Sequence, residues 1–205
     1  MSRMLIKHAA IMAENEVIED GYVLIEDGVI KDLGKSSSST IDETDLEVIS
    51  MKGYKAVPGF IDVHIHGAGG ADTMDGTTEA IGTMANVLPK EGTTSFLATT
   101  MTQAKDQIVQ ALRNAADYKE NHNDGAEAEV LGVHLEGPFI NPSKKGAQPE
   151  QHIITPDIDL FKEWQNEANG HIRLVTVAPE MENGLEFIRY ITSNGVTASI
   201  GHTDS

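Results

Sequence analysis

From residue 57 onward the chain alternates short strand-like runs with amphipathic helical segments, and this alternation constrains its fold most. The strand-like runs cover residues 60–65, 94–99, 129–135, 172–177 and 196–200. The helical segments between them cover residues 77–89, 104–118, 156–168 and 184–193. Strands that alternate with helices form right-handed βαβ units and a parallel sheet. The sequence therefore predicts an α/β fold whose sheet is either open or closed into a barrel.

Two of the predicted helices begin with capping residues. Thr77 or Thr78 stands before the first helix, and threonine is a favoured N-cap. Thr155 stands before the third helix and is followed by Pro156, since proline is common at the first helical position. These residues predict that the first helix begins near residue 77 and the third at residue 156.

The first 56 residues are predicted to be β structure. Runs 5–11, 22–26, 29–33 and 46–49 are rich in β-branched and aromatic residues, and Asp27-Gly28 between two of them is a hairpin signal. A few short strands bury little core by themselves. We therefore predict a small β-domain over residues 1–56 that precedes an α/β domain over residues 57–205.

The charge of the chain argues against two classes of partner. It has 15 basic and 32 acidic residues, a formal net charge of −17. Nucleic acids and anionic membranes attract clustered Lys and Arg, so neither is expected as a partner. No cysteine is present, which excludes a disulfide framework and a thiolate metal site. No segment resembles a secretory signal or a membrane span, and we expect a cytoplasmic protein.

His64 and His66 form the strongest local motif. Residues i and i+2 of a strand point to the same side, so both imidazoles are expected to project together at the C-terminal end of the first parallel strand. Ligand-binding groups gather at that end in barrels and in open sheets. Two neutral imidazoles can hold one divalent ion, or each can form separate hydrogen bonds.

Two further strand ends carry residues of the same kind. Glu136 ends the third strand on the same side as His134, and His202 follows the fifth strand. A carboxylate at this rim is desolvated, so it pairs with a metal or caps a backbone N–H. Because parallel strands end at one rim, we predict a metal site formed by His64, His66, Glu136 and His202. Glu180 follows the fourth strand and is expected to support this rim or to cap a loop.

The motifs resemble a known enzyme family. Residues 57–67, VPGFIDVHIHG, are similar to the first-strand signature of the amidohydrolase superfamily. Residues 134–139, HLEGPF, followed by Lys145-Gly146-Ala147 and later by Gly201-His202-Thr203, resemble the N-acetylglucosamine-6-phosphate deacetylases more specifically. The β-rich start with its Asp27-Gly28 turn is also similar to the small domain of that family. The resemblance extends over essentially the whole chain.

The resemblance implies a fold and a reaction. The fold is a metal-dependent-hydrolase type TIM (β/α) barrel with a small β-sandwich domain. The reaction is the hydrolysis of N-acetyl-D-glucosamine 6-phosphate to glucosamine 6-phosphate and acetate. It implies one or two divalent ions, with Zn or Fe favoured, and a homodimer of the full-length protein. Glu136 and His202 match metal ligands, His64 and His66 match a pair that some members use for a second ion, and Ala147 and Gln148 match substrate contacts.

The resemblance also implies that parts of the family pattern lie beyond Ser205. These are a further metal-binding His, the catalytic Asp, most phosphate-binding groups and the last strand of the small domain. Five βα strands are expected here, whereas a closed barrel needs eight strands and typically about 250 residues. We therefore assign no catalytic residue within the chain and expect these 205 residues to be inactive alone.

Two other functions remain open at the level of sequence. The His64/His66 pair would also suit an amidohydrolase that acts on cyclic amides or N-acyl amino acids, although the Glu136 motif and the lack of an Arg soon after His66 argue against it. A non-catalytic half-barrel could instead bind a metal and cover its open sheet edges by self-association.

Overall fold

The computed structural model describes residues 2–123, 125 and 127–205. The chain divides into two units, Met1–Pro58 and Gly59–Ser205. Each unit has its own buried apolar clusters. Across the described residues, none of the helices combines the length and the apolar character needed to cross a membrane.

The first unit is a five-stranded sheet in the order β3-β2-β1-β4, with β5 also paired to β1. Its strands are β1 (Arg3–Met12), β2 (Val17–Glu26), β3 (Val29–Lys35), β4 (Glu47–Ser50) and β5 (Lys55–Ala56). The predicted hairpin is confirmed, because Glu26 pairs with Val29 across Asp27 and Gly28. Both turn residues have positive φ, of 49° and 77°. A two-residue hairpin of this kind requires that conformation, which Asp-Gly adopts readily.

Alternation along the strands gives the first sheet an apolar cluster on each face. Leu5, Tyr22 and Leu24 form one apolar cluster. Ala9, Ile11 and their neighbours Ile18 and Val23 form a second. Because side chains of a strand alternate between faces, the two clusters lie on opposite faces of the sheet, whereas β3 and β4 are largely exposed.

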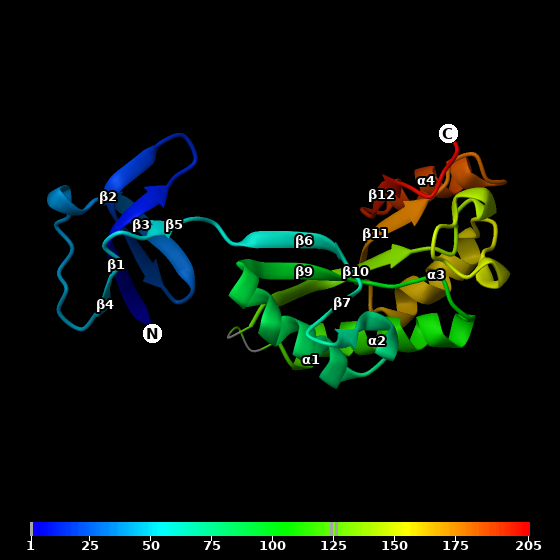
Figure 1. The fold of residues 1–205 in the computed structure, drawn as a ribbon, viewed down its shortest axis with the longest axis horizontal. Helices are drawn as coiled ribbons and strands as arrows, with labels where there is room; N and C mark the ends of the chain where they lie inside the picture. The colour runs from blue at the N-terminus through cyan, green and yellow to red at the C-terminus, as the bar shows by residue number, and fades with distance from the viewer. Residues whose placement is uncertain (1, 124, 126) are drawn as a thin grey trace. The chain divides into compact units, whose positions relative to one another are not determined.

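The second unit is a curled parallel sheet in the order β12-β11-β10-β9-β6 (Figure 1). Its strands are β6 (Phe60–Ile65), β9 (Thr93–Thr99), β10 (Glu129–Glu136), β11 (Ile172–Val177) and β12 (Thr197–Ile200). A separate short hairpin is formed by β7 (Gly67–Ala68) and β8 (Ala71–Asp72). The prediction of five parallel strands in chain order is confirmed.

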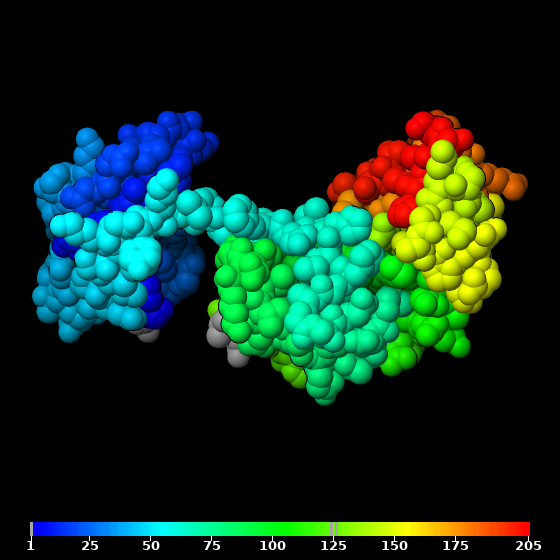
Figure 2. Space-filling model, in the orientation of Figure 1, coloured from blue at the N-terminus to red at the C-terminus, as the bar shows by residue number. Residues whose placement is uncertain are grey.

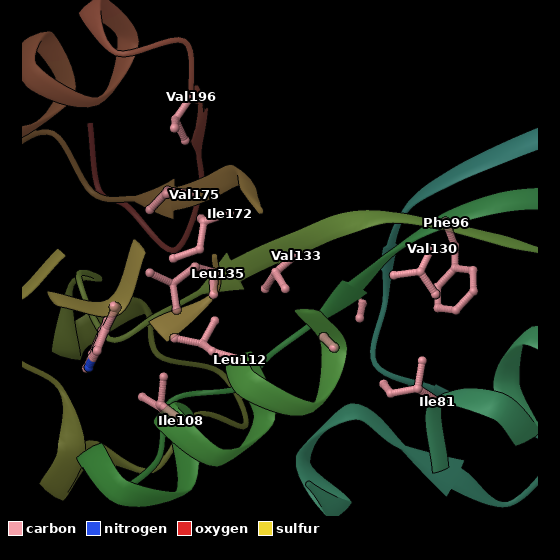
Figure 3. Close-up of a cluster of buried hydrophobic side chains, with 14 of the residues drawn as sticks. Ile81, Phe96, Ile108, Leu112, Val130, Val133, Leu135, Ile172, Val175 and Val196 are labelled. Carbon is pink, nitrogen blue, oxygen red and sulfur yellow. The ribbon is translucent and has the colours of Figure 1, made fainter. Parts of the chain in front are cut away.

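In the described part of the chain, four α-helices join these strands and bury one face of the sheet. They are α1 (Thr78–Val87), α2 (Lys105–Asn121), α3 (Ile158–Glu167) and α4 (Gly184–Ser193). Figure 3 shows Ile108 and Leu112 of α2 directed toward Val133 and Leu135 of β10. The i, i+4 spacing in α2 and the i, i+2 alternation in β10 each place two apolar side chains on one face, and the two faces meet in one core.

The helix starts confirm one predicted cap and correct another. Thr77 caps α1 by accepting a hydrogen bond from the backbone N–H of Ala80 at 3.2 Å. Helix α3, however, begins at Ile158 rather than at residue 156, so the prediction that Thr155 caps it is wrong. Asp157 is the cap, because one of its carboxylate oxygens accepts from the N–H groups of Asp159 and Leu160 at 2.9 and 3.0 Å.

The opposite, concave face of the second sheet changes character along the strands. Val63, Leu97, Leu131 and Leu174 line an open apolar hollow there. Toward the C-terminal strand ends the residues on this face are polar, and irregularities in β6 and β10 interrupt the strict alternation between the two parts. The fold thus places a polar rim above an apolar interior.

Candidate metal centre

Three strand ends bring the predicted ligands to one rim. His64 lies in β6 and His66 directly follows it, Glu136 is the last residue of β10, and His202 follows β12. The strands are parallel, so these ends share one edge of the sheet (Figure 1). Ligands far apart in sequence therefore meet through sheet order alone.

The Glu136 carboxylate is the centre of the cluster. Its Oε2 atom lies 3.0 Å from Nε2 of His64 and 2.9 Å from Nε2 of His66. Its Oε1 atom lies 2.9 Å from Nε2 of His202. Among the described residues, the ligand atoms of His64, His66 and Glu136 all lie within 4.8 Å of one another. His202 joins this group through the second carboxylate oxygen.

Burial and charge oppose each other at Glu136. Its side chain is only 5 % exposed, and such burial raises the pKa of a carboxyl group. The hydrogen bonds of His66 and His202 and the charge of His64 outweigh burial and lower the pKa of Glu136 to about 2. In turn, the hydrogen bond to Glu136 raises the pKa of His66. The Glu136 carboxylate is therefore ionised at neutral pH.

Backbone contacts set the orientation of His202. Its Nδ1 atom donates to the carbonyl oxygen of Lys144 at 2.8 Å, because a carbonyl oxygen only accepts, and its Nε2 atom lies 2.9 Å from Oε1 of Glu136. Its own carbonyl accepts from the N–H of Asn141 at 3.0 Å. The residue has a φ of 50°, a left-handed conformation that is costly for a non-glycine residue. These contacts hold it there.

Glu180 supports the same loops from the end of β11. One of its oxygens accepts from Asn141 Nδ2 and from the N–H of Asp204, both at 2.8 Å, and the other accepts from the Thr203 hydroxyl. Desolvation raises its pKa, but these hydrogen bonds outweigh it and lower the pKa to about 2. The sequence left open whether Glu180 supports the rim or caps a loop. In the structure Glu180 holds together the loops that follow β10 and β12.

His134 is a further polar residue of the rim, for which the sequence motif suggested no role of its own. Its side chain is buried, with Nε2 2.8 Å from the Thr176 hydroxyl, and its ring meets that of His64 edge-on at 4.8 Å between centroids. Burial, helped by the charge of His64, lowers the pKa of His134 to about 4. The i, i+2 spacing from Glu136 was the signal that placed it on this face.

The two residues matched to substrate contacts differ in accessibility. Ala147 is exposed in the loop after β10, whereas Gln148 is buried. The Oε1 atom of Gln148 accepts from the backbone N–H of Thr102 at 2.7 Å. Gln148 therefore holds the loop between β9 and α2 with its carbonyl oxygen.

The chemistry of the donor set suits a divalent ion. Imidazole nitrogens and a carboxylate oxygen are ligands for Zn, Fe, Mn or Co. Three imidazoles gather around one buried carboxylate, a donor set that a divalent ion would fit. His64, His66 and Glu136 fit the group that a metal-dependent hydrolase holds, and His202 lies in position to extend it.

Two family models match the chain. The model described as "Amidohydrolase family" matches residues 56–192. The model described as "BsNagA composite domain" matches residues 3–38. Together they cover parts of both structural units.

The chain is similar to several proteins described as N-acetylglucosamine-6-phosphate deacetylase. The protein of that name from Bacillus subtilis (strain 168) is 47 % identical over 203 residues, which are 98 % of this chain and 51 % of the relative. The one from Lysinibacillus sphaericus is 37 % identical over 202 residues, again 98 % and 51 %. The crystal structure of the Thermotoga maritima protein is similar with a TM-score of 0.78 and 32 % identity, covering 98 % of this chain and 49 % of that one. The chain spans about half the length of these relatives.

Proposed function

Because the chain belongs to the amidohydrolase family, we propose that its rim site serves the hydrolysis of N-acetyl-D-glucosamine 6-phosphate to glucosamine 6-phosphate and acetate. The observation that carries this proposal is the His64–His66–Glu136 cluster at the C-terminal strand ends. The identity of the substrate is inferred from relatives of up to 47 % identity that are named as deacetylases of this sugar phosphate. Catabolism of an amino sugar follows from that substrate.

The proposed ligands of the metal are His64, His66, Glu136 and His202. A divalent ion held by them supplies Lewis-acid chemistry, which activates water and polarises an amide carbonyl near neutral pH. The Glu136 carboxylate remains ionised at neutral pH and contributes a negative charge. The Lys144 carbonyl accepts from Nδ1 of His202 and so leaves Nε2 for the ion. Zn or Fe is the proposed ion, one or two per chain.

The substrate pocket is proposed to include Ala147 and Gln148. Ala147 is accessible, so its backbone is free to meet a sugar. Gln148 has committed Oε1 to Thr102, which leaves its Nε2 group as the donor available to a substrate oxygen.

Proton transfer to the leaving amine is proposed to need a group outside residues 1–205. Glu136 is engaged with three imidazoles, and Asp204 forms an ion pair with Lys144 at 2.7 Å. Neither is a free carboxylate for acid–base work. We therefore propose that residues 1–205 contribute metal ligands and substrate contacts, and that turnover requires the remainder of the pattern seen in the family.

The place and assembly of the enzyme follow from the substrate and the family. A sugar phosphate is charged and does not cross membranes unaided, which supports a cytoplasmic location. We also propose a homodimer, which light scattering of the purified full-length protein tests directly. A monomeric mass at all concentrations would contradict the dimer and leave the proposed reaction unaffected.

An acetate-release assay tests the proposed reaction. The full-length protein is incubated with Zn²⁺ or Fe²⁺ and with N-acetylglucosamine 6-phosphate, its C4 epimer, unphosphorylated N-acetylglucosamine, an N-acetyl amino acid and a cyclic amide. We expect release from the 6-phosphate and little from the unphosphorylated sugar. Preferred turnover of the amino acid or the cyclic amide would overturn the proposal, and so would the absence of metal-dependent turnover. The same assay on residues 1–205 is expected to show no robust release.

A further inference from the structure

The end of β6 that carries His64 is poorly held by the sheet itself. The parallel ladder between β6 and β9 is irregular between Asp62 and Ile65, the stretch that contains His64. Side chains replace the missing ladder contacts there. Asp62 accepts from the N–H of His64 at 3.0 Å, and the Thr99 hydroxyl accepts from the N–H of Ile65 at 2.9 Å. The backbone of a proposed metal ligand thus depends on side chains for its position.

His134 reaches this irregular stretch from the neighbouring part of the sheet. Its Nδ1 atom lies 3.4 Å from the hydroxyl of Thr99 in β9, the same hydroxyl that accepts from the N–H of Ile65. On its other side, Nε2 lies 2.8 Å from the hydroxyl of Thr176 in β11. His134 is therefore anchored to β11 and contacts Thr99 of β9, which in turn holds the end of β6.

The ring of His134 also limits the freedom of the His64 ring. The two rings meet edge-on, with centroids 4.8 Å apart and planes at 80°. The side chain of His64 is 52 % exposed, whereas that of His134 is 1 % exposed. An exposed imidazole keeps one orientation only where neighbours fix it, and the buried neighbours of His64 are Glu136, 3.0 Å from its Nε2 atom, and His134.

We propose that His134 is a positioning residue of the metal centre, which holds Thr99 against the backbone after His64 and fixes the orientation of the His64 ring. The inference rests on the proposed metal-binding function of His64, His66 and Glu136. His134 itself does not bind the ion in this proposal, because Nε2 is engaged with Thr176. Its effect is transmitted through His64.

A set of matched variants tests this role. His134→Ala removes both the ring contact and the hydrogen bonds, and His134→Asn restores a donor and an acceptor near the Nδ1 position. Leu135→Ala is the control, because Leu135 is equally buried on the same strand but faces the opposite, apolar core. Zn²⁺ affinity is measured by competition with a chromogenic chelator, and stability by urea unfolding. Hydrogen exchange of the His64 and Ile65 amides is measured on the metal-free protein.

The expected results separate positioning from general stability. Residues that orient metal ligands typically contribute about 10–100-fold to metal affinity. We expect His134→Ala to weaken Zn²⁺ binding by at least about tenfold. His134→Asn should recover part of that loss, and Leu135→Ala should lose stability with its affinity nearly unchanged. The His64 and Ile65 amides should exchange faster in His134→Ala than in Leu135→Ala.

Two results would overturn the proposal. The first is unchanged Zn²⁺ affinity in His134→Ala. The second is a loss of Zn²⁺ affinity that is in the same proportion to the loss of stability in His134→Ala as in Leu135→Ala. If the unmutated protein takes up no divalent ion, the proposed function fails. The positioning role is then decided by the exchange rates alone, and equal rates in the two variants would reject it. If His134→Ala does not fold, Thr176→Val removes only the hydroxyl that anchors the ring and takes its place.

Discussion

At the scale of single residues, Glu136 has the largest predicted effect on metal binding. Its two oxygens contact three imidazoles from two other strand ends. We expect Glu136→Gln to weaken Zn²⁺ binding by more than about 100-fold, beyond the range for residues that only support ligands. Equilibrium dialysis measures this affinity. Glu129→Gln, an exposed position at the other end of the same strand, is the control. Equal affinity of the two variants would remove Glu136 from the site.

Gln148 offers a prediction on stability at the same scale. It is buried, and its Oε1 atom is the acceptor for the N–H of Thr102. Gln148→Leu leaves that buried N–H without a partner, so we expect a loss of about 1–3 kcal/mol in the free energy of unfolding. Urea denaturation measures it, with exposed Gln151→Leu as the control. A loss below that of the control would show that the hydrogen bond contributes little.

At the scale of elements, the start of α3 distinguishes two capping residues. Asp157 accepts two N–H groups of the first turn, whereas Thr155 lies outside the helix. Replacing an N-cap by alanine costs about 1 kcal/mol. We expect Asp157→Ala to lose about that amount and Thr155→Ala to stay within about 0.5 kcal/mol of the unmutated protein. Thermal unfolding of both variants decides between them, and the reverse order would restore Thr155 as the cap.

Most element types could be predicted from the sequence because local patterns determine them. Strands β6 and β11 and helix α4 have the predicted bounds. The start of α3 could not be predicted, because Thr155 and Asp157 are both good capping residues. The fold decides between them. Pro156 is buried, and the short helix α3 begins only after it, at Ile158, so Asp157 occupies the N-cap position.

At the scale of the whole molecule, a metal ion would join strand ends that are far apart along the chain. Its proposed ligands span residues 64–202, so binding to the folded state alone stabilises the second unit. At a free ion concentration of 100 times the dissociation constant, the expected gain is about 2.7 kcal/mol. Unfolding is followed with Zn²⁺ and with a chelator. Coincident transitions in the two conditions would contradict a site formed only on folding.

The net negative charge of the chain affects how it would bind the proposed substrate. A net charge of −17 repels a sugar phosphate, so binding depends on local donors and on the charge of a bound ion. Lys144 is a cation on the rim of the second unit, and it already pairs with Asp204. A bound divalent ion would therefore favour binding of the proposed anionic substrate.

The sequence by itself determined the order of the elements, the parallel sheet and the rim to which His64, His66, Glu136 and His202 belong. It could do so because strand alternation and helix spacing are local, and because parallel strands must end at one edge. Only the tertiary structure decided which atoms meet. The carboxylate of Glu136 lies among three imidazoles, His134 contacts the irregular end of β6, and Gln148 turns inward to Thr102. These contacts join strands and loops far apart in the chain, and their distances depend on sheet curvature and packing, which no local pattern contains.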